Sequence, residues 1–271
     1  MSNKALLVGI NRYPAAPLRG CVNDITDMAQ FLVDHCGFVQ SDVRLLADER
    51  ATRQEIMARL DWLVDGAQPG DRLFFHYSGH GAQMATRDHQ GEVDGLDEVV
   101  CPVDFDWTDE HVIRDKDFRR VFGSVPEDCE FVWVSDSCHS SGLTKDVPPP
   151  NTTWRTFPVP ADIQWRIDAA QSMGFKALTL PCASEKSGNL ALLSGCASND
   201  VSADSVFNGR PNGVLTHFLL QALSAADGMK APLDLLAATV RETISATGKF
   251  RQVPGLEGSP AIIKRPFLAN S

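Results

Sequence analysis

Short apolar runs alternate with helical patterns through the first 140 residues of this 271-residue chain. Residues 4–10 and 43–47 are continuous enough to be buried strands. The helix expected from Asn23 and Asp24 has apolar residues at helical spacing, and Thr52 with Glu55 forms a capping-box pattern for a second helix. Strands that alternate with helices predict an α/β fold with a mostly parallel sheet that helices cover on both faces.

Two of the strand-like runs end in residues that can react. The run at 72–76 leads into YSGHG (77–81), and the run at 130–134 leads into SDSCH (135–139). Parallel strands end at a common edge of the sheet, and in open α/β folds that edge binds ligands. His80 and Cys138 are therefore expected at one site. A thiol attacks as the thiolate, which a nearby imidazole generates near neutral pH, so the pattern predicts a cysteine hydrolase.

We assign Cys138 as the nucleophile and His80 as the general base and acid. His139 is the competing base, but neighbouring residues project in different directions where a chain leaves a strand. The backbone N–H groups of Gly81 and Cys138 are expected to form an oxyanion hole. No third carboxylate or amide is evident in the sequence, which favours a catalytic dyad. The remaining cysteines are interpreted as buried side chains, with at most a role for Cys21 in the wall of a pocket.

The composition excludes several other classes of protein. A net charge of −10 argues against nucleic acid or an anionic membrane surface as the main partner. Seven cysteines without a C-x-x-C pair indicate free thiols in a reducing compartment, so we expect a cytoplasmic location. The apolar run at 5–10 is too short for a signal sequence or a membrane span. We expect the chain to be a monomer.

The pattern changes after Cys138. Residues 145–188 include three consecutive prolines and little periodicity, which predicts a long surface connection with a helix near 161–173. Further elements are expected as a strand at 190–196 and helices at 213–225 and 232–246. Before this connection we also expect a strand at 98–103 and a helix at 115–125. The whole chain is interpreted as one domain.

Several segments together resemble one family. They are GCVND (20–24), YSGHG (77–81), VCPVD (100–104) and DSCHS (136–140), followed by LSGC (193–196) and NG (212–213). Their order and spacing are similar to those of metacaspases and their bacterial relatives, the orthocaspases, in a compact form without a prodomain. The Gln-Ala-Cys-Arg-Gly type of signature of animal caspases is absent.

This resemblance implies a caspase-like fold with a sheet of about six strands. Residues 1–144 would be large-subunit-like, residues 145–188 a linker, and residues 189–271 small-subunit-like. It also implies that Asp24 and Asp136 line the primary specificity pocket, beside Ser78 and Cys21. Paired carboxylates bind a guanidinium or an ammonium, which predicts cleavage of protein and peptide substrates after Arg or Lys and disfavours Asp. The linker holds basic residues at which the enzyme could cut itself: Lys145, Arg155, Arg166, Lys176 and Lys186.

Calcium is the one cofactor that the resemblance implies. Its ligands would be Asp94 or Asp97, Asp115 and Asp146, although Arg114 stands where the family has a carboxylate. The acidic stretch at 92–98 does not have the spacing of an EF-hand loop. Without the resemblance, a solvated acidic loop is the simpler interpretation.

Two alternatives to a basic-specific endopeptidase stay open. A catalytically silent caspase-like module would act through protein contacts, but it would need neither Cys138 nor His80. A general esterase or amidase would use the same dyad without the paired carboxylates.

Overall fold

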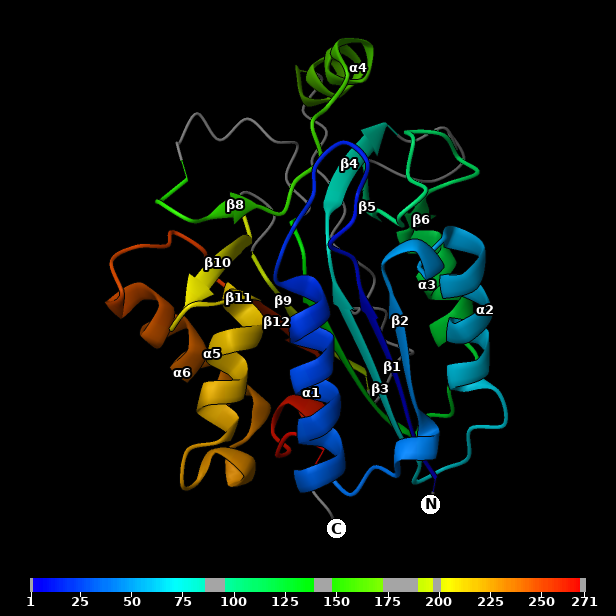
Figure 1. The fold of residues 1–271 in the computed structure, drawn as a ribbon. Helices are drawn as coiled ribbons and strands as arrows, with labels where there is room; N and C mark the ends of the chain where they lie inside the picture. The colour runs from blue at the N-terminus through cyan, green and yellow to red at the C-terminus, as the bar shows by residue number, and fades with distance from the viewer. Residues whose placement is uncertain (1, 86–95, 139–147, 173–189, 197–200, 269–271) are drawn as a thin grey trace.

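A six-stranded sheet forms the centre of the molecule in the computed structural model, which describes residues 2–85, 96–138, 148–172, 190–196 and 201–268 (Figure 1). Its strand order is β12-β9-β7-β3-β1-β2. The strands are β1 (Asn3–Gly9), β2 (Val43–Ala47), β3 (Arg72–Ser78), β7 (Glu130–Asp136), β9 (Leu190–Ser194) and β12 (Gly255–Gly258). All neighbouring pairs are parallel except β12 with β9. The predicted α/β architecture with about six mostly parallel strands is therefore confirmed.

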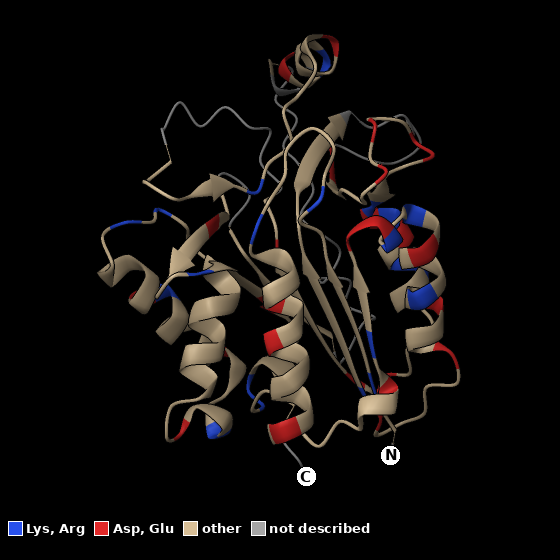
Figure 2. Ribbon diagram, viewed as in Figure 1, with Lys and Arg blue, Asp and Glu red and all other residues tan. Residues whose placement is uncertain are grey.

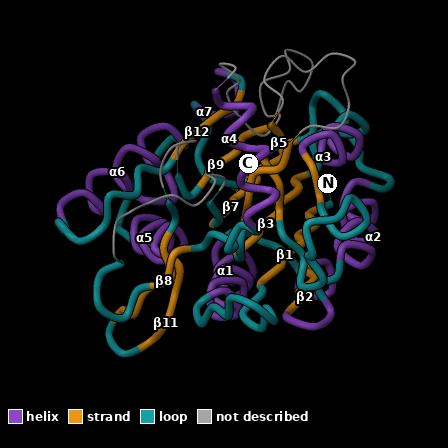
Figure 3. The backbone as a smooth tube through the Cα atoms, turned by 90° about the horizontal axis from the view of Figure 1, so that it is seen from above, coloured by secondary structure: helices purple, strands orange, loops and turns teal. Residues whose placement is uncertain are grey.

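Helices cover both faces of this sheet, as the view from above shows (Figure 3). The helices are α1 (Cys21–His35), α2 (Arg53–Val64), α3 (Asp115–Phe122), α4 (Ala161–Ser172), α5 (Val214–Leu223), α6 (Leu233–Ala246) and α7 (Pro260–Ile263). Helices α1, α5 and α6 pack on one face, whereas α2 and α3 pack on the other. The expected N-cap of α2 is present, since the Thr52 side chain accepts a hydrogen bond from the Glu55 backbone at 3.3 Å.

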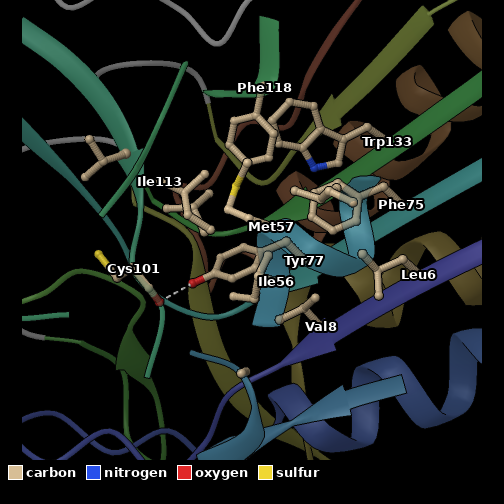
Figure 4. Packing of buried hydrophobic residues seen from close by; sticks show 14 of the residues in the cluster. Leu6, Val8, Ile56, Met57, Phe75, Tyr77, Cys101, Ile113, Phe118 and Trp133 are labelled. Carbon is tan, nitrogen blue, oxygen red and sulfur yellow. Dashed lines mark hydrogen bonds between the residues drawn. The ribbon is translucent and has the colours of Figure 1, made fainter. Parts of the chain in front are cut away.

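The side chains of the strands alternate between two hydrophobic clusters. On the α2 and α3 face, Phe75 of β3 and Trp133 of β7 pack against Phe118 of α3, with ring centroids 4.5 to 6.1 Å apart (Figure 4). On the other face, Phe74 and Val132 pack with residues of α1, α5 and α6. Because strands β1, β3, β7 and β9 are buried on both faces, they are largely apolar, which explains the continuous apolar runs in the sequence.

Two three-stranded sheets flank the central one. The first contains β4 (Gly81–Ala85), β5 (Leu96–Val100) and β6 (Ile113–Arg114), all antiparallel. The strand expected at 98–103 is thus displaced to Leu96–Val100, and it lies outside the central sheet. The second contains β8 (Thr153–Trp154), β10 (Ala203–Phe207) and β11 (Arg210–Gly213), also antiparallel. Strands β8, β10 and β11 lack an apolar alternation long enough to be predicted from the sequence.

The prediction that residues 145–188 form a surface connection is wrong for the part around β8. Arg155 is fully buried, and Phe157 and Ile167 are also buried. The segment is held there by pairing with β10 and by contacts with the edge of the central sheet. The expected helix in this segment is present as α4, which projects away from the central sheet (Figure 1).

Charged side chains are distributed unevenly over the fold. They are frequent on α2 and α3, while in the central strands they lie mostly near the strand ends (Figure 2). Strands β3 and β7 lie side by side, with Ser78 paired to Asp136 at their carboxyl ends. This register brings the two chemically marked segments of the sequence to one edge of the sheet. Among the described helices, none has the length and apolar character that a membrane span requires.

Candidate active site

Cys138 lies just beyond the end of β7 and is fully buried. Its Sγ donates to the Ser202 carbonyl at 3.1 Å and accepts from the Ser202 backbone N–H at 2.6 Å. Burial raises the pKa of this thiol well above its ordinary value, and the neighbouring Cys196 acts in the same direction. The thiol is therefore neutral in this closed arrangement, and it needs a base to become a nucleophile.

His80 lies just beyond the end of β3, and the structure fixes its tautomer. Its Nε2 is 2.7 Å from the Ala16 carbonyl. A carbonyl can only accept a hydrogen bond, so Nε2 carries the proton and Nδ1 has the free lone pair. The buried Nδ1 has no hydrogen-bond partner among the described residues. Burial lowers the pKa of His80 to about 4, so the ring is a neutral base.

Two tyrosines fix the backbone of His80. The His80 N–H donates to the Tyr13 hydroxyl at 3.0 Å, and the Tyr77 hydroxyl donates to the His80 carbonyl at 2.7 Å. The Tyr13 ring also packs against the imidazole, with centroids 4.6 Å apart. Phe157 covers the imidazole from another side at 5.0 Å. Hydrogen bonds and packing together hold the imidazole in one orientation.

Beside Cys138 and His80 is a buried pocket of three carboxylates, and it contains the side chain of Arg155. The Arg155 Nη2 lies 2.7 Å from Asp24 and 3.1 Å from Asp204, and its Nη1 lies 3.2 Å from Asp136. Nη1 also donates to the Ser78 hydroxyl at 2.8 Å and to the Asp136 carbonyl at 2.7 Å. All of these side chains are fully buried. We call Asp24, Asp136 and Asp204, together with Ser78, the carboxylate pocket.

The carboxylates are held in place independently of Arg155. Asp24 accepts from the Gly213 backbone at 2.9 Å, and Asp204 accepts from the Gly20 backbone at 3.0 Å. Asp136 accepts from the Thr216 hydroxyl at 2.8 Å. Donors that are fixed in this way keep the pocket preorganised for a cation, because buried carboxylates are costly without hydrogen-bond partners.

Burial and the Arg155 guanidinium have opposite effects on the pKa values of the carboxylates in this pocket. Burial raises the pKa values of Asp136 and Asp204, and the charge of Arg155 counteracts part of that shift. Burial disfavours the charged form of Arg155, but the carboxylates outweigh it and hold the pKa of Arg155 above its ordinary value. A cation in the pocket therefore stabilises carboxylates that burial would otherwise neutralise.

The residues predicted for the pocket from the sequence are brought together. Asp24 and Asp136 both contact the guanidinium. Ser78 links Asp24 to Arg155, since its hydroxyl donates to Asp24 at 2.7 Å and accepts from Arg155 Nη1. Cys21 is buried next to this group. Burial raises the pKa of its thiol, and the nearby charge of Arg155 offsets only part of that increase. Gly81 donates its N–H to the Arg155 carbonyl at 3.2 Å. His139, the competing base, lies outside the described residues.

Sequence reasoning missed Asp204 and the partners of Asp136. Asp204 belongs to β10, which has no apolar signature, and its place in the pocket depends on the pairing of β10 with β8 and β11. Ser202 donates to Asp136 at 2.7 Å, and Thr216 reaches it from the start of α5. No local pattern in the sequence marks these residues.

The residues predicted to bind calcium are only partly described, because Asp94 and Asp146 lie outside the described residues. The Asp97 carboxylate forms an ion pair with Arg114, whose other nitrogen lies 2.6 Å from Asp109. Asp115 is buried and pairs with Arg119 at 2.7 Å. Within the described ranges no three acidic, histidine or cysteine side chains are grouped to hold a metal ion. The two described members of the predicted set, Asp97 and Asp115, are thus each paired with an arginine.

The sequence of this chain is similar to sequences of known proteins. The model of the metacaspase peptidase C14 domain matches residues 3–148. Metacaspase-1 of Schizosaccharomyces pombe is 32% identical over 292 aligned residues, which cover 94% of this chain and 67% of the relative. The chain thus spans about two thirds of that relative's length.

Solved structures show the same fold. A protein from Geobacter sulfurreducens superposes with a TM-score of 0.72 over 99% of both chains, at 24% identity. Caspase-1 from Spodoptera frugiperda superposes with a TM-score of 0.61 over 99% of this chain and 92% of its own, at 10% identity. The fold is caspase-like, and the chain belongs to the metacaspase family of cysteine-type endopeptidases.

Proposed function

We propose that this chain hydrolyses peptide bonds after Arg or Lys, with Cys138 as the nucleophile and His80 as general base and acid. The observation that carries the proposal is the guanidinium of Arg155 held by Asp24, Asp136 and Asp204 beside the thiol. A buried site with three carboxylates selects a cationic side chain, because a neutral or anionic one would leave the carboxylates unpaired. An arginine can satisfy several of them at once through its planar fork.

The proposed reaction starts from a neutral thiol and a neutral imidazole. His80 Nδ1 accepts the thiol proton while Sγ attacks the substrate carbonyl carbon, and the Ala16 carbonyl stabilises the resulting imidazolium. The N–H of Ser202, which contacts Sγ, stabilises the developing thiolate. The Gly81 N–H donates to the carbonyl oxygen as it becomes an oxyanion. The imidazolium then protonates the leaving amine, and water hydrolyses the thioester.

Turnover of three tripeptide reporters tests this proposal. Reporters ending in Arg, Lys or Asp are given to the wild-type chain and to Cys138→Ala. We expect turnover after Arg and Lys, little after Asp, and none with the variant. A chain that turns over none of them would support the silent module. Equal turnover of a simple ester and of all three peptides would support the general esterase or amidase.

Calcium stimulation stays a prediction of the resemblance alone. Because Arg114 already neutralises Asp97, calcium would have to displace that ion pair. Calcium titration by calorimetry, paired with reporter turnover in EDTA, measures the effect directly. Heat of binding with increased turnover would support calcium control, and equal turnover in EDTA would contradict it.

The substrates of this family are proteins, and three narrower statements about partners and location stay predictions. A monomer is tested by light scattering, and absence of nucleic-acid binding by a mobility shift at low salt. A reducing, cytoplasmic location is consistent with six described cysteines that are all free and buried.

A further inference from the structure

We propose that the bond between Arg155 and Thr156 is a processing site at which this chain cuts itself, with residues 153–155 bound in its own active site as the substrate. This inference rests on the proposed function, and it selects one bond among the basic residues of the linker. Three observations support it: the backbone pairing of the segment, the burial of the Arg155 side chain, and the position of the Arg155 carbonyl.

The backbone of the segment is bound as an added strand. Thr153 and Trp154 form β8, which pairs antiparallel with β10, and the Arg155 N–H continues the pairing by donating to the Ser202 carbonyl at 2.9 Å. Peptide ligands bind at exposed sheet edges in this manner, with backbone hydrogen bonds for affinity and pockets for side chains. Trp154 packs against Cys138, Cys196 and Val201. The segment therefore has both a defined register and side-chain contacts.

The side chain of Arg155 is bound as a specific ligand. It is fully buried, and its ion pairs and hydrogen bonds extend to residues 19 to 131 positions away in the chain. Arg166, the other predicted cleavage residue of the linker that lies within the described ranges, is exposed on α4. A surface connection without a binding role would not bury an arginine against three carboxylates, because desolvating such a charge is costly.

The carbonyl of Arg155 lies where a scissile carbonyl is needed. It accepts the Gly81 N–H, the proposed oxyanion donor. Arg155 N and Cys138 Sγ share one hydrogen-bond acceptor, the Ser202 carbonyl, so the nucleophile lies beside the Arg155 backbone. On the other side of the bond, Thr156 forms an isolated parallel β-bridge with Gly81, and the Phe157 ring packs on the His80 ring.

The cleavage balances as a hydrolysis. Cys138 Sγ forms a thioester with the Arg155 carbonyl carbon, and the bond to the Thr156 nitrogen breaks. The Thr156 amine leaves with the proton that His80 took from the thiol. Water then attacks the thioester, releases the Arg155 carboxylate and returns the proton to Cys138. Until residues 153–155 leave, other substrates compete with them for the same pocket.

The mass of the intact chain after incubation tests this inference. Wild type is expected to convert to fragments 1–155 and 156–271, whereas Cys138→Ala stays whole. Arg155→Gln is expected to stay whole at this bond, and Arg155→Lys to be cut there more slowly. Arg166→Gln is the matched control on the exposed helix, and it should be cut as wild type is. Near-ultraviolet circular dichroism of each variant verifies that it is folded.

The concentration dependence of the cut separates self-cleavage within one chain from cleavage by a neighbour. Because the segment already lies in its own cleft, the rate constant should be unchanged over a hundredfold range of protein concentration. Added wild type should leave the Cys138→Ala chain whole. A rate that rises in proportion to concentration would overturn cleavage within one chain.

Turnover of an arginine reporter by the same samples separates this inference from the proposed function. Turnover by a wild-type chain that stays whole, or that is cut only at another residue, would overturn the processing site and leave the proposed function intact. Absence of both turnover and cleavage would overturn both. We expect a lag in reporter turnover by the uncut wild type and none by Arg155→Gln.

Discussion

Asp204 is the residue that changes the pocket from a pair of carboxylates to a set of three. It contacts the same nitrogen of Arg155 as Asp24 does, at 3.1 Å. Asp24 precedes Arg155 in the sequence, whereas Asp204 follows it. Its own position is fixed by the backbone N–H groups of Arg19 and Gly20 at 2.9 and 3.0 Å. Because these donors do not depend on the ligand, Asp204 is expected to contribute to substrate binding after the linker has left.

Replacing this carboxylate tests its contribution. Asp204→Asn removes one charge from the cation site, and a hydrogen bond to a charged group contributes about 1.5–3 kcal/mol. We expect kcat/KM for an arginine reporter to fall about ten- to a hundredfold. Asp227→Asn makes the same change at the surface, where the Asp227 side chain is 84% exposed, and should leave turnover unchanged. Equal kcat/KM in wild type and Asp204→Asn would contradict the assignment.

At the scale of elements, the sequence predicted those parts of the site that follow from strand ends. Strands β3 and β7 contain continuous apolar runs at 73–75 and 131–134, so their ends at Ser78 and Asp136 could be located. Their neighbouring places in the sheet follow from parallel packing. The strand β10 could not be located in the same way. It is short and half polar, and its position depends on pairing with two segments that are distant in the chain or equally short.

The burial of the linker around Arg155 could not be predicted from the sequence either. Prolines and weak periodicity indicated a surface connection, yet Arg155 is buried because a cation site exists elsewhere in the fold to receive it. Local sequence does not contain that information. The predicted set of basic linker residues included Arg155, but only the three-dimensional arrangement distinguishes it from Arg166.

The pairing of β8 with β10 predicts that substrate length matters. A blocked tripeptide reporter, Thr-Trp-Arg, can reproduce the backbone pairing and the contact of Trp154 with Cys196 and Val201. A blocked single arginine cannot. We expect kcat/KM to be about tenfold higher for the tripeptide, given about 0.5–1.5 kcal/mol for each backbone hydrogen bond. Thr-Asp-Arg keeps the pairing without the apolar contact and should fall between them. Equal values for all three would exclude strand addition.

At the scale of the whole molecule, the sheet separates two apolar clusters, and buried polar groups are concentrated near its carboxyl edge. His76 is one of them. It lies on β3 and contacts the Thr216 hydroxyl at 3.3 Å, which in turn binds Asp136. Burial lowers the pKa of His76 to about 4, with the charge of Asp24 acting in the opposite direction.

The lowered pKa of His76 predicts how the free energy of unfolding depends on pH. In the unfolded chain its pKa is near 6.5, so between about pH 6.5 and 4 the unfolded state binds more protons than the folded state. Its contribution to the free energy of unfolding should be complete above pH 6.5 and should decrease toward pH 4, by up to about 1.4 kcal/mol per pH unit.

Urea unfolding at several pH values measures the effect as a difference from His76→Gln. The wild type should lose stability faster than the variant as pH falls through this range. His111→Gln is a control, because Asp106 raises the pKa of that surface histidine. Parallel pH dependence in wild type and His76→Gln would contradict the buried neutral histidine.

Labelling by a peptide fluoromethyl ketone tests most directly whether Cys138 is the nucleophile of an arginine-selective site. The chain is Arg155→Gln, whose own segment cannot place a guanidinium in the carboxylate pocket. We expect the Thr-Trp-Arg ketone to form one adduct, mapped by peptide mass to Cys138, at least about tenfold faster than the Thr-Trp-Asp ketone does. Labelling of a different cysteine, or equal rates for the two ketones, would contradict this assignment.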